Sequence, residues 1–314
     1  YTVEACAIPL APLAARAGVA LVEAGATGLD AAAQRVTLSD GSTLAYDVLS
    51  IDTGAVMDRD AIPGAREHGL FVRPIEHFTV LWQSLLALSA QRALSVVVVG
   101  GGAAGVELVM ALQHRLGERA RLSLVTGGPA PVATHPAGVQ RRVRQALQAR
   151  GITVFEDSCT EVAAAHLTLG RGMRLQCDAP VLAIGSSAPA WLRGSGLALD
   201  ERGFIGTGAT LQSSSHANVF AAGDVASRAD APHPKSGVYA VRAGPPLALN
   251  LRRCIAGGRL AAYHPQRRSL NLLACGGRHA IASWGPFAVQ GDWVWRWKDR
   301  IDRAFVARYT VQAR

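Results

Sequence analysis

The sequence predicts a mixed α/β protein in which short buried strands pair in parallel and alternate with helices. Three observations support this class. The stretch "SVVVVGGGAAGVELVMAL" (95–112) runs from an apolar strand through three glycines into a helix-like segment. A pattern of strand, hairpin and strand occurs twice along the chain, and another short apolar strand ends in Gly223 and Asp224. An apolar run that stops at glycine is typical of a strand buried in a parallel sheet.

Composition limits the classes of protein that fit. The chain has 314 residues, of which 49% are hydrophobic and 18% charged, so we expect a globular protein with more than one domain. No run of 18 uncharged apolar residues and no signal peptide occur, so no transmembrane helix is predicted. The odd number of cysteines (five) and the absence of CxxC favour a reducing cytoplasm over a disulfide framework or zinc site.

The net charge of +9 is a weak indication of a nucleic-acid partner. Of the 32 basic residues only Lys235 and Lys298 are lysine, so 30 are arginine, which is typical of a biased composition. No compact basic cluster interleaved with aromatic residues occurs before residue 290. We therefore expect no nucleic acid among the partners.

The glycines after the strand Val96–Val99 fit the pattern G-x-G-x-x-G at Gly100, Gly102 and Gly105. In such a turn the first glycine permits the sharp bend, the second lets the backbone approach a pyrophosphate, and the third allows close helix–strand packing. A helix that starts near Ala103 would point the N–H groups of its first turn at the phosphates. This segment therefore predicts a Rossmann-like dinucleotide-binding turn, with a purely structural glycine turn as the alternative.

The next strand, Leu122–Val125, ends at Thr126, in the place where an acidic residue usually binds the ribose of NAD. Because no acid occurs there, the sequence does not separate NADH from NADPH. Arg141 and Arg142 lie downstream and are candidates for a 2′-phosphate. The alternative places them on the solvated face of a helix around 138–150.

An internal repeat indicates two copies of one nucleotide-binding unit. Each copy has a strand, a turn-rich hairpin, and then Asp, an apolar strand and Gly seven positions after the Asp. The two Asp residues are 131 positions apart, as are the two final glycines, Gly54 and Gly185. The glycine turn of the first copy would fall before residue 1, so we expect the first βαβ unit to be missing and Tyr1 not to be the natural start. Chance similarity of two hairpins is the alternative. The paired segments are 18–30 with 151–163, 35–47 with 167–178, and 47–54 with 178–185.

The stretch "SSSHANVFAAGDVA" (213–226) predicts a second nucleotide-binding edge. Its short strand, Val219–Ala222, ends in Gly223 and Asp224. The glycine allows a cofactor to approach closely, and the carboxylate can accept hydrogen bonds from sugar-like hydroxyls. The position of this stretch, about 40 residues after the second copy of the repeat, makes the signal specific.

Taken together, the segments "YDVLSIDTG", "IPG" (62–64), "GGGAAGVE", "VLAIG" and "VFAAGD" resemble the pyridine nucleotide–disulfide oxidoreductases. The resemblance runs from about residue 18 to the C-terminus. Within it, "PKSGVYAVRAGPPLALNL" (234–251) is similar to the segment that type II NADH dehydrogenases place over the flavin. The closing "WVWRWKDRIDRAF" (293–305) resembles dehydrogenase-like proteins fused to, or encoded beside, selenophosphate synthetase.

This resemblance implies FAD and NAD(P)H as cofactors and a role for each matching residue. Glu107 and Lys235 would be catalytic, with Glu107 beside the nicotinamide. A structural alternative stays open for each residue. Glu107 would stabilise the first turn of its helix through its charge, and Lys235 would be a solvated loop residue. The cofactor-binding residues would be, for FAD, Gly54, Gly223, Asp224, Ser236, Gly237 and Val238, on the NAD(P)H side, Gly100, Gly102, Ala103, Ala104, Gly105 and Thr126, and, for a cofactor left unassigned, Gly185.

The implied activity is hydride transfer from NAD(P)H to flavin, followed by electron transfer to a quinone or another small acceptor. Because the expected missing unit would hold the FAD pyrophosphate, the resemblance also implies that this chain binds FAD poorly. The alternative is a non-catalytic nucleotide-binding module that partners a selenium-handling enzyme such as selenophosphate synthetase. A sulfide:quinone reductase, which would need a reactive cysteine pair at the flavin, is a further alternative.

The fold class that follows is α/β, with two Rossmann-like, three-layer ββα domains, the first lacking its N-terminal βαβ unit, and a small α+β C-terminal domain. The predicted boundaries are 1–80 for an FAD-domain remnant, 81–200 for the NAD(P)H domain, 201–255 for the second FAD part and 256–314 for the C-terminal domain. Alternate tryptophans at 293, 295 and 297 predict a strand followed by a short helix. Tryptophan beside Arg and Lys also suits a bilayer interface, so we expect a cytoplasmic protein with peripheral membrane contact, or else a hairpin that caps the core.

Overall fold

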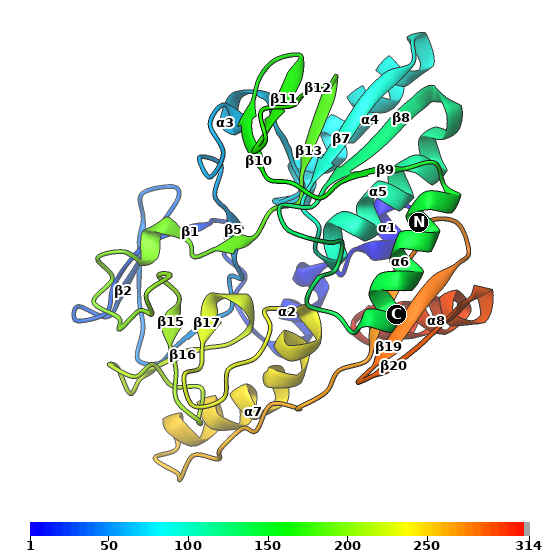
Figure 1. The fold of residues 1–314 in the computed structure, drawn as a ribbon. Helices are drawn as coiled ribbons and strands as arrows, with labels where there is room; N and C mark the ends of the chain where they lie inside the picture. Colours follow the sequence, from blue (N-terminus) through cyan, green and yellow to red (C-terminus); the bar gives the residue numbers. More distant parts are fainter. Residues whose placement is uncertain (311–314) are drawn as a thin grey trace. The chain divides into compact units, whose positions relative to one another are not determined.

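The computed structural model describes residues 1–310, and its contacts divide the chain into two compact units (Figure 1). The first unit comprises Tyr1–Leu21, Asp58–Gly185 and the chain from Leu270 onward. The second comprises Val22–Met57 and Ser186–Ser269. The predicted domain boundaries stay a prediction.

A five-stranded parallel sheet forms the centre of the first unit, which confirms the predicted α/β class. Every residue of the strand that precedes the glycine turn is buried except Ser95. Its six residues pair in register with the next strand along the chain, from Leu94 opposite Ala120 to Val99 opposite Val125. The strands, in their order across the sheet, are β6 (Leu70–Phe71), β13 (Ala179–Leu182), β7 (Leu94–Val99), β8 (Ala120–Val125) and β9 (Thr153–Phe155).

Helices pack against one face of this sheet because side chains alternate between the two faces of a strand. Val96 and Val98 of β7 share a core with Val106 and Val109 of the helix that follows the glycine turn. The helix predicted near Ala103 therefore forms, with its apolar side on the sheet. The helices of this part are α1 (Val3–Cys6), α2 (Leu10–Ala17), α3 (Ala65–His68), α4 (Ile75–Gln91), α5 (Ala103–Leu116), the 3₁₀ helix η1 (Gly117–Arg119) and α6 (Ala137–Ala149).

A three-stranded antiparallel sheet lies on the other side and completes the predicted ββα layering. Ser95 and Val97 of β7 line the same pocket as Leu175 and Gln176 of this second sheet, whereas Val96 and Val98 belong to the core with α5. The strands of the antiparallel sheet are β10 (Cys159–Val162), β11 (His166–Leu169) and β12 (Arg174–Gln176).

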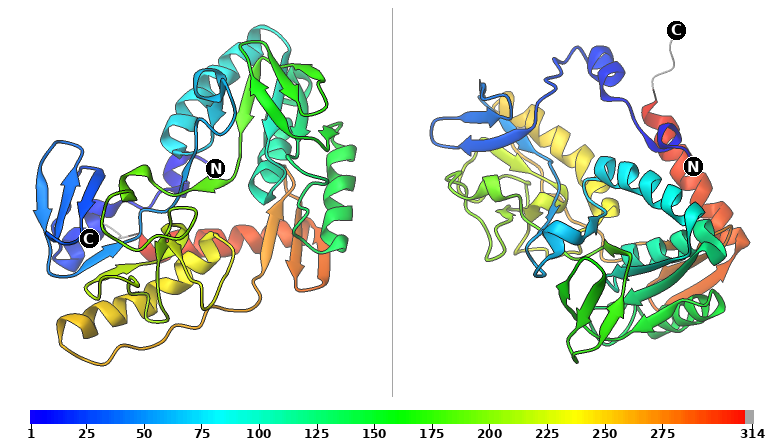
Figure 2. Two further views of the ribbon diagram at one scale, coloured as in Figure 1. Left: turned by 60° about the vertical axis from the view of Figure 1, so that its left-hand side comes forward. Right: turned by 90° about the horizontal axis from the view of Figure 1, so that it is seen from above.

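The C-terminal part packs on helices α5 and α6, as both views in Figure 2 show. Leu273 and Ile281 belong to the same core as the parallel sheet. Gly276 has a φ of 73°, and a β-carbon there would lie 2.5 Å from the carbonyl oxygen of Met110. This close approach requires glycine and joins the C-terminal sheet to α5. The elements are β18 (Asn271–Ala274), β19 (Ala280–Trp284), β20 (Phe287–Gly291) and α8 (Asp292–Tyr309).

The strand predicted at 293–297 is wrong, because α8 begins at Asp292 and runs through this stretch without a break. The alternating tryptophans suggested a period of two, but the apolar residues also recur every fourth position from Trp293 to Tyr309. That spacing places successive side chains beside one another on a helix. Accordingly, Trp293 stacks on Trp297 with ring centroids 6.4 Å apart, while Val294 is fully buried against the sheet.

The second unit contains the first copy of the repeat, and its strand order matches that of the second copy. Each copy has a three-stranded antiparallel sheet followed by a strand of a parallel pair or sheet. The first strand pair is irregular in both copies, between Ala26 and Gly28 in one and between Cys159 and Glu161 in the other. The repeat is therefore confirmed from the antiparallel sheet onward, whereas residues 19–23 form no strand where the second copy has β9. The strands of the first copy are β1 (Ala26–Asp30), β2 (Arg35–Leu38), β3 (Thr43–Ala45) and β4 (Leu49–Ile51).

Strand β4 pairs in parallel with β16 (Val219–Ala221), the buried strand predicted before Gly223 and Asp224. The segment after Lys235 forms helix α7, which begins at Gly237 and ends at Ile255. The other elements of the unit are β5 (Val56–Met57), β14 (Ser186–Ser187), β15 (Ile205–Gly206), β17 (Ala226–Ser227) and the 3₁₀ helices η2 (Ala190–Leu192) and η3 (Gly223–Val225).

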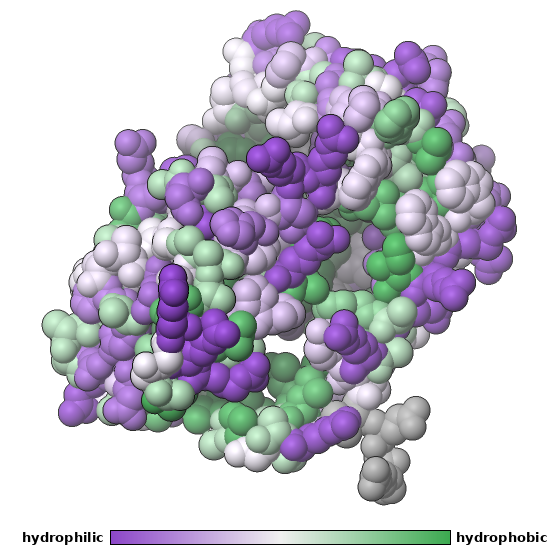
Figure 3. Space-filling view, turned by 90° about the horizontal axis from the view of Figure 1, so that it is seen from below, coloured by the Kyte–Doolittle hydropathy of each residue, from purple (hydrophilic) through white to green (hydrophobic). Residues whose placement is uncertain are grey.

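The surface of the described chain mixes polar and apolar side chains. Figure 3 shows one face on which hydrophobic side chains reach the surface among hydrophilic ones. Within residues 1–310, no helix is both long enough and apolar enough to span a bilayer.

Candidate functional site

The glycine turn after β7 forms a tight cradle at the carboxyl end of the parallel sheet. Gly100 has a φ of 134°, which strongly favours glycine, and its N–H donates to the carbonyl oxygen of Val125 at 2.8 Å. A β-carbon on Gly105 would overlap the carbonyl oxygen of Gly100, so only glycine fits this closest point between helix and turn. Gly102, by contrast, has no protein atom within 4 Å of the position of a β-carbon. The turn is thus packed tightly on the protein side and open above Gly102.

Helix α5 begins directly after this turn. Gly102 is its N-cap residue and offers no side-chain hydrogen bond to the first turn, where Ala103 and Ala104 lie. The first N–H groups of a helix have no partner within the helix, and the helix dipole favours an anion beside them. The tight glycines, the open space at Gly102 and this uncapped first turn together fit a pyrophosphate group.

Thr126 follows β8 and lies against the cradle. It occupies the position where an acidic residue usually binds the ribose. A β-carbon on Gly101 would lie within 2.8 Å of Thr126, which shows how closely the two backbones approach. Only 8% of Thr126 is exposed, and its hydroxyl donates to the carbonyl oxygen of Gly128. The hydroxyl is therefore turned into its own loop.

Glu107 lies in the second turn of the cradle helix, and its carboxylate points to the C-terminal sheet. Its Oε1 accepts the backbone N–H of Ala274 in β18 at 2.7 Å. Burial raises the pKa of Glu107, although the Ala274 N–H and the charge of Lys298 act in the opposite direction. The side chain is thus tied within the first unit, by a contact that the sequence analysis did not predict.

The second unit has an edge of the same kind at the carboxyl ends of β4 and β16. Gly54 follows β4 with a φ of 72°, and Gly223 follows β16 with a φ of 71°. A β-carbon on Gly223 would lie 3.3 Å from Cβ of Ala240 in α7, so the glycine lets the helix pack closely. Asp224 follows in η3, which contacts α7. Parallel strands that end together at such an edge are the usual place for a ligand in α/β proteins.

Lys235 is held by the segment that carries Asp224. Its Nζ donates to the carbonyl oxygens of Asp224 and Ala226 at 2.9 and 2.8 Å, and it lies 3.5 Å from the ring centre of Phe204. Burial is the main reason why the pKa of Lys235 is lowered. The lysine is therefore not a solvated loop residue, since it links the start of α7 to the edge after β16.

The N-terminus of α7 also has an open first turn. Ser236 is the N-cap residue, but its side chain makes no capping hydrogen bond. Gly237 has no protein atom within 4 Å of a β-carbon position, and Val238 is 37% exposed. In the first unit, Gly185 after β13 is similarly open.

Asp52 is a polar residue of this edge that the sequence analysis passed over. It follows β4 directly, accepts the hydroxyl of Ser50 at 2.8 Å and also accepts the N–H of Ala222. Desolvation by the surrounding protein raises the pKa of Asp52, although the residue is partly open to solvent. The available signal was an acid two residues before Gly54, at the carboxyl end of a predicted strand.

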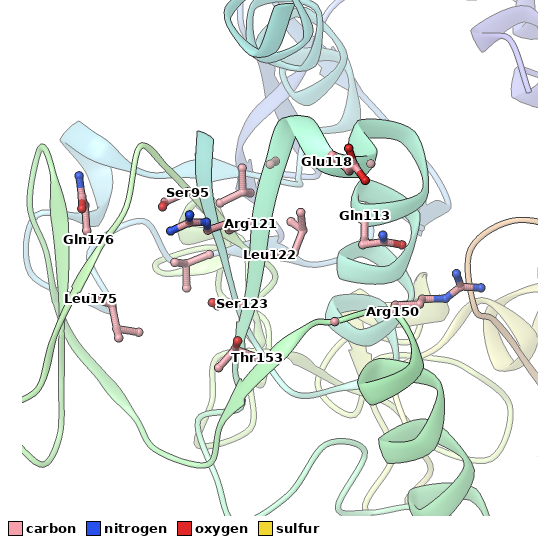
Figure 4. Close-up of a pocket in the computed structure, with 15 residues that line it drawn as sticks. Ser95, Gln113, Glu118, Arg121, Leu122, Ser123, Arg150, Thr153, Leu175 and Gln176 are labelled. Atoms are coloured by element: carbon pink, nitrogen blue, oxygen red, sulfur yellow. The ribbon is translucent and has the colours of Figure 1, made fainter. Parts of the chain in front are cut away.

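A polar pocket of about 480 Å³ lies in the first unit, away from the cradle. Figure 4 shows Ser95, Arg121 and Thr153 around it, and these residues lie at the amino ends of β7, β8 and β9. The glycine turn is at the opposite, carboxyl end of the same strands. This pocket is therefore not the predicted dinucleotide site.

The buried cysteines do not carry reactive thiolates. Burial raises the pKa of Cys177 to about 12 and that of Cys275 to about 11. A thiol reacts as its thiolate, so both groups are unreactive near neutral pH. All five cysteines, which lie within the described residues, are free thiols.

The parallel sheet and its glycine cradle define a dinucleotide-binding α/β protein. More specifically, the chain belongs to the pyridine nucleotide-disulphide oxidoreductase family, whose sequence pattern matches residues 13–244. This family consists of FAD-dependent oxidoreductases that use NAD(P)H.

Two curated relatives have the same sequence identity to this chain. The chain is 32% identical over 233 residues to demethylphylloquinone reductase NdbB of Synechocystis, which covers 71% of this chain and 58% of the relative. It is 32% identical over 236 residues to the NADH dehydrogenase-like protein Rv1812c of Mycobacterium tuberculosis, covering 71% and 59%. The matches thus span about three fifths of the length of these relatives.

Solved structures share the fold. The sulfide:quinone oxidoreductase of Aquifex aeolicus superposes with a TM-score of 0.83 at 18% identity, over 98% of this chain and 80% of that one. NDH2 of Plasmodium falciparum gives 0.78 at 12% identity, over 91% and 82%. None of the proteins named here is a selenophosphate synthetase, so the predicted association with that enzyme stays a prediction.

Proposed function

We propose that the protein is an FAD-dependent NAD(P)H:acceptor oxidoreductase whose electrons pass to a quinone or another small acceptor. The observation that carries this proposal is the cradle formed by Gly100, Gly102 and Gly105, which is closed on the protein side and open where a pyrophosphate would lie. The similarity to a demethylphylloquinone reductase supports a quinone as the acceptor.

The cradle side would hold the NAD(P)H. The N–H groups of the first turn of α5, at Ala103 and Ala104, would bind the pyrophosphate, while Gly105 keeps the helix close to the turn. Glu107 would lie one turn further along the helix. Its contact with Ala274 supports a second role, in fixing the helix to the C-terminal sheet.

The edge after β4 and β16 would hold the FAD. Gly54 and Gly223 leave room for a close approach, and Asp224 would accept hydrogen bonds from the ribityl chain or lie near the phosphates. The open first turn of α7, from Ser236 to Val238, would face the flavin and favour negative charge on it. Lys235 would position this edge through its two hydrogen bonds to backbone carbonyl oxygens. When bound, FAD supplies hydride acceptance and onward electron transfer, which no protein side chain can perform.

A direct test follows the flavin absorbance near 450 nm. The protein is mixed with an excess of FAD under anaerobic conditions and then given NADH or NADPH. Bleaching, followed by recovery when a water-soluble quinone is added, is the expected result. Flavin that is bleached by neither nucleotide faster than in a sample without the protein would contradict the proposal.

We also propose that helix α8 contacts a membrane surface, as expected for a cytoplasmic protein at the inner face of a membrane that delivers electrons to quinone. Five apolar residues recur every fourth position on α8, and each is between 37% and 51% exposed. Arg and Lys side chains flank them along the helix, which suits the interface between headgroups and acyl chains. The five apolar residues, named here the α8 stripe, are Trp293, Trp297, Ile301, Phe305 and Tyr309.

A further inference from the structure

The position that usually reads the ribose offers no carboxylate and no outward hydroxyl. Thr126 donates its hydroxyl to the carbonyl oxygen of Gly128, and the N–H of Gly128 donates back to this hydroxyl at 3.3 Å. The residue is 8% exposed. A carboxylate at this position binds the two ribose hydroxyls of NAD and repels the 2′-phosphate of NADP. Both effects are missing here.

The loop that follows cannot replace the absent carboxylate. Residues 126–136 contain no Asp or Glu. The loop is also held in place, because the N–H of Val132 donates to the carbonyl oxygen of Gly101 at 2.7 Å and that of Gly127 to the carbonyl oxygen of Asp157 at 2.9 Å. It therefore lies beside the cradle without bringing negative charge to it.

The acids at the carboxyl end of the neighbouring strand β9 are already engaged. Asp157 accepts the backbone N–H groups of Ser158 and Arg171 at 2.8 and 3.2 Å, and only 16% of its side chain is exposed. Glu156 forms an ion pair of 3.0 Å with Arg144. Neither carboxylate is available for ribose hydroxyls without giving up these contacts.

Two arginines reach the same edge with much of their side chains in solvent. Arg144 of α6 is 49% exposed at its side chain, and Arg171, on the turn between β11 and β12, is 79% exposed. The guanidinium of Arg171 donates to the carbonyl oxygen of Glu156 at 3.0 Å, and its Nε lies 3.8 Å from a carboxylate oxygen of Asp157, which places it beside the end of β9. A guanidinium has five N–H donors, so these contacts leave capacity for a phosphate. Arg142, a candidate from the sequence, instead donates to Gly138 in its own helix.

We propose that the cradle prefers the phosphorylated dinucleotide, NADPH, and that Arg144 and Arg171 bind its 2′-phosphate. This inference rests on the proposed function, because it takes the cradle as the site of the pyrophosphate. The missing carboxylate removes the discrimination against NADPH. The two exposed arginines attract the 2′-phosphate, a group that NADH lacks.

Calorimetric titration of the full chain with NADP⁺ and NAD⁺ tests this inference without requiring turnover. We expect NADP⁺ to bind at least about tenfold more tightly than NAD⁺ at low salt. Raising the salt concentration should weaken NADP⁺ more steeply, because screening acts on the additional phosphate charge. Binding of both nucleotides with equal affinity would overturn the inference but leave the proposed function standing. Binding of neither would overturn both.

Alanine variants at the two arginines locate the phosphate. Arg144→Ala and Arg171→Ala should each weaken NADP⁺ by roughly tenfold, the effect of losing one charge-assisted group, and leave NAD⁺ within about twofold. Arg121→Ala is the matched control, since Arg121 is exposed at the opposite end of β8. Equal losses for both nucleotides would assign the arginines a merely structural role and overturn the inference. Lysine variants at both sites, which keep the charge, should retain part of the preference and so exclude misfolding as the cause.

Discussion

The carboxylate of Glu107 accepts the backbone N–H of Ala274, and this bond joins the cradle helix α5 to strand β18 across 167 residues of sequence. Lys298 and Asp302 of α8 act on the same carboxylate through their charges. The glycine cradle, the C-terminal sheet and helix α8 are thus connected at one half-buried acid. A substitution of Glu107 should therefore change the stability of the protein as well as its nucleotide binding.

Glu107→Gln should gain stability relative to the parent protein as the pH rises. Burial raises the pKa of Glu107 in the folded chain, whereas the unfolded carboxyl ionises at its ordinary pKa. The stability contributed by its proton is therefore complete below the ordinary pKa and is lost as the pH rises through the folded value. Gln keeps the shape and an acceptor for Ala274 but does not ionise.

The measurement compares urea midpoints of parent and variant from about pH 4 to about pH 8. Glu118→Gln is the matched control, because Glu118 is exposed and outside this contact. A difference between parent and Glu107→Gln that does not change with pH would contradict the prediction.

Alanine at Gly102 and at Gly105 should separate ligand binding from folding. Gly102 has a φ of −71° and no protein atom near a β-carbon, so Gly102→Ala should fold normally and intrude only on the ligand. We expect its affinity for NAD(P)⁺ to fall at least about tenfold with little change in the melting temperature. Calorimetric titration and a thermal melt measure the two quantities on the same sample.

Gly105→Ala should behave in the opposite way, because its β-carbon would overlap the carbonyl oxygen of Gly100. Overpacking of this kind costs about 1–3 kcal/mol, so the melting temperature should fall clearly. If Gly102→Ala binds nucleotides as well as the parent does, the open space above Gly102 is not the phosphate site.

The sequence predicted the parts of this protein that depend on local chemistry. Val96–Val99, the glycines and the start of α5 lie within about 20 residues, so strand pattern and glycine spacing were sufficient. The partner of Glu107 could not be predicted, because Ala274 comes from a distant strand and contributes only a backbone N–H. The strand expected at 293–297 failed because a short alternation of tryptophans competed with a longer period of four, and the longer pattern decided the helix.

Lys235→Met should destabilise the second unit. The lysine donates to the carbonyl oxygens of Asp224 and Ala226 and lies over the ring of Phe204, and all three contacts would be lost. We expect a loss of about 2 kcal/mol in the free energy of unfolding, which allows for partial exposure of the ammonium group. Urea unfolding followed by fluorescence gives this quantity.

The chain offers a matched control, since its other lysine, Lys298, forms an ion pair of 3.1 Å with Asp302 one turn along α8. An ion pair of this kind is worth about 0.3–0.5 kcal/mol, so Lys298→Met should cost much less than Lys235→Met. Equal losses for the two variants would show that the contacts of Lys235 with the edge after β16 contribute little.

The α8 stripe should determine binding to lipid vesicles. Trp293 and Trp297 stack on one another and are 51% and 41% exposed, so they can enter the interface without unpacking the core. Replacing both by Gln removes large amphipathic rings, and the fraction of protein that sediments with vesicles containing anionic phosphatidylglycerol should fall at least about tenfold.

Met173→Gln is the matched control, because Met173 is 51% exposed on a hairpin turn away from α8. Raising the salt concentration should weaken the parent's binding only partly, since the aromatic contribution is not screened. Undiminished sedimentation of the double variant would assign the exposed stripe to a contact other than a membrane.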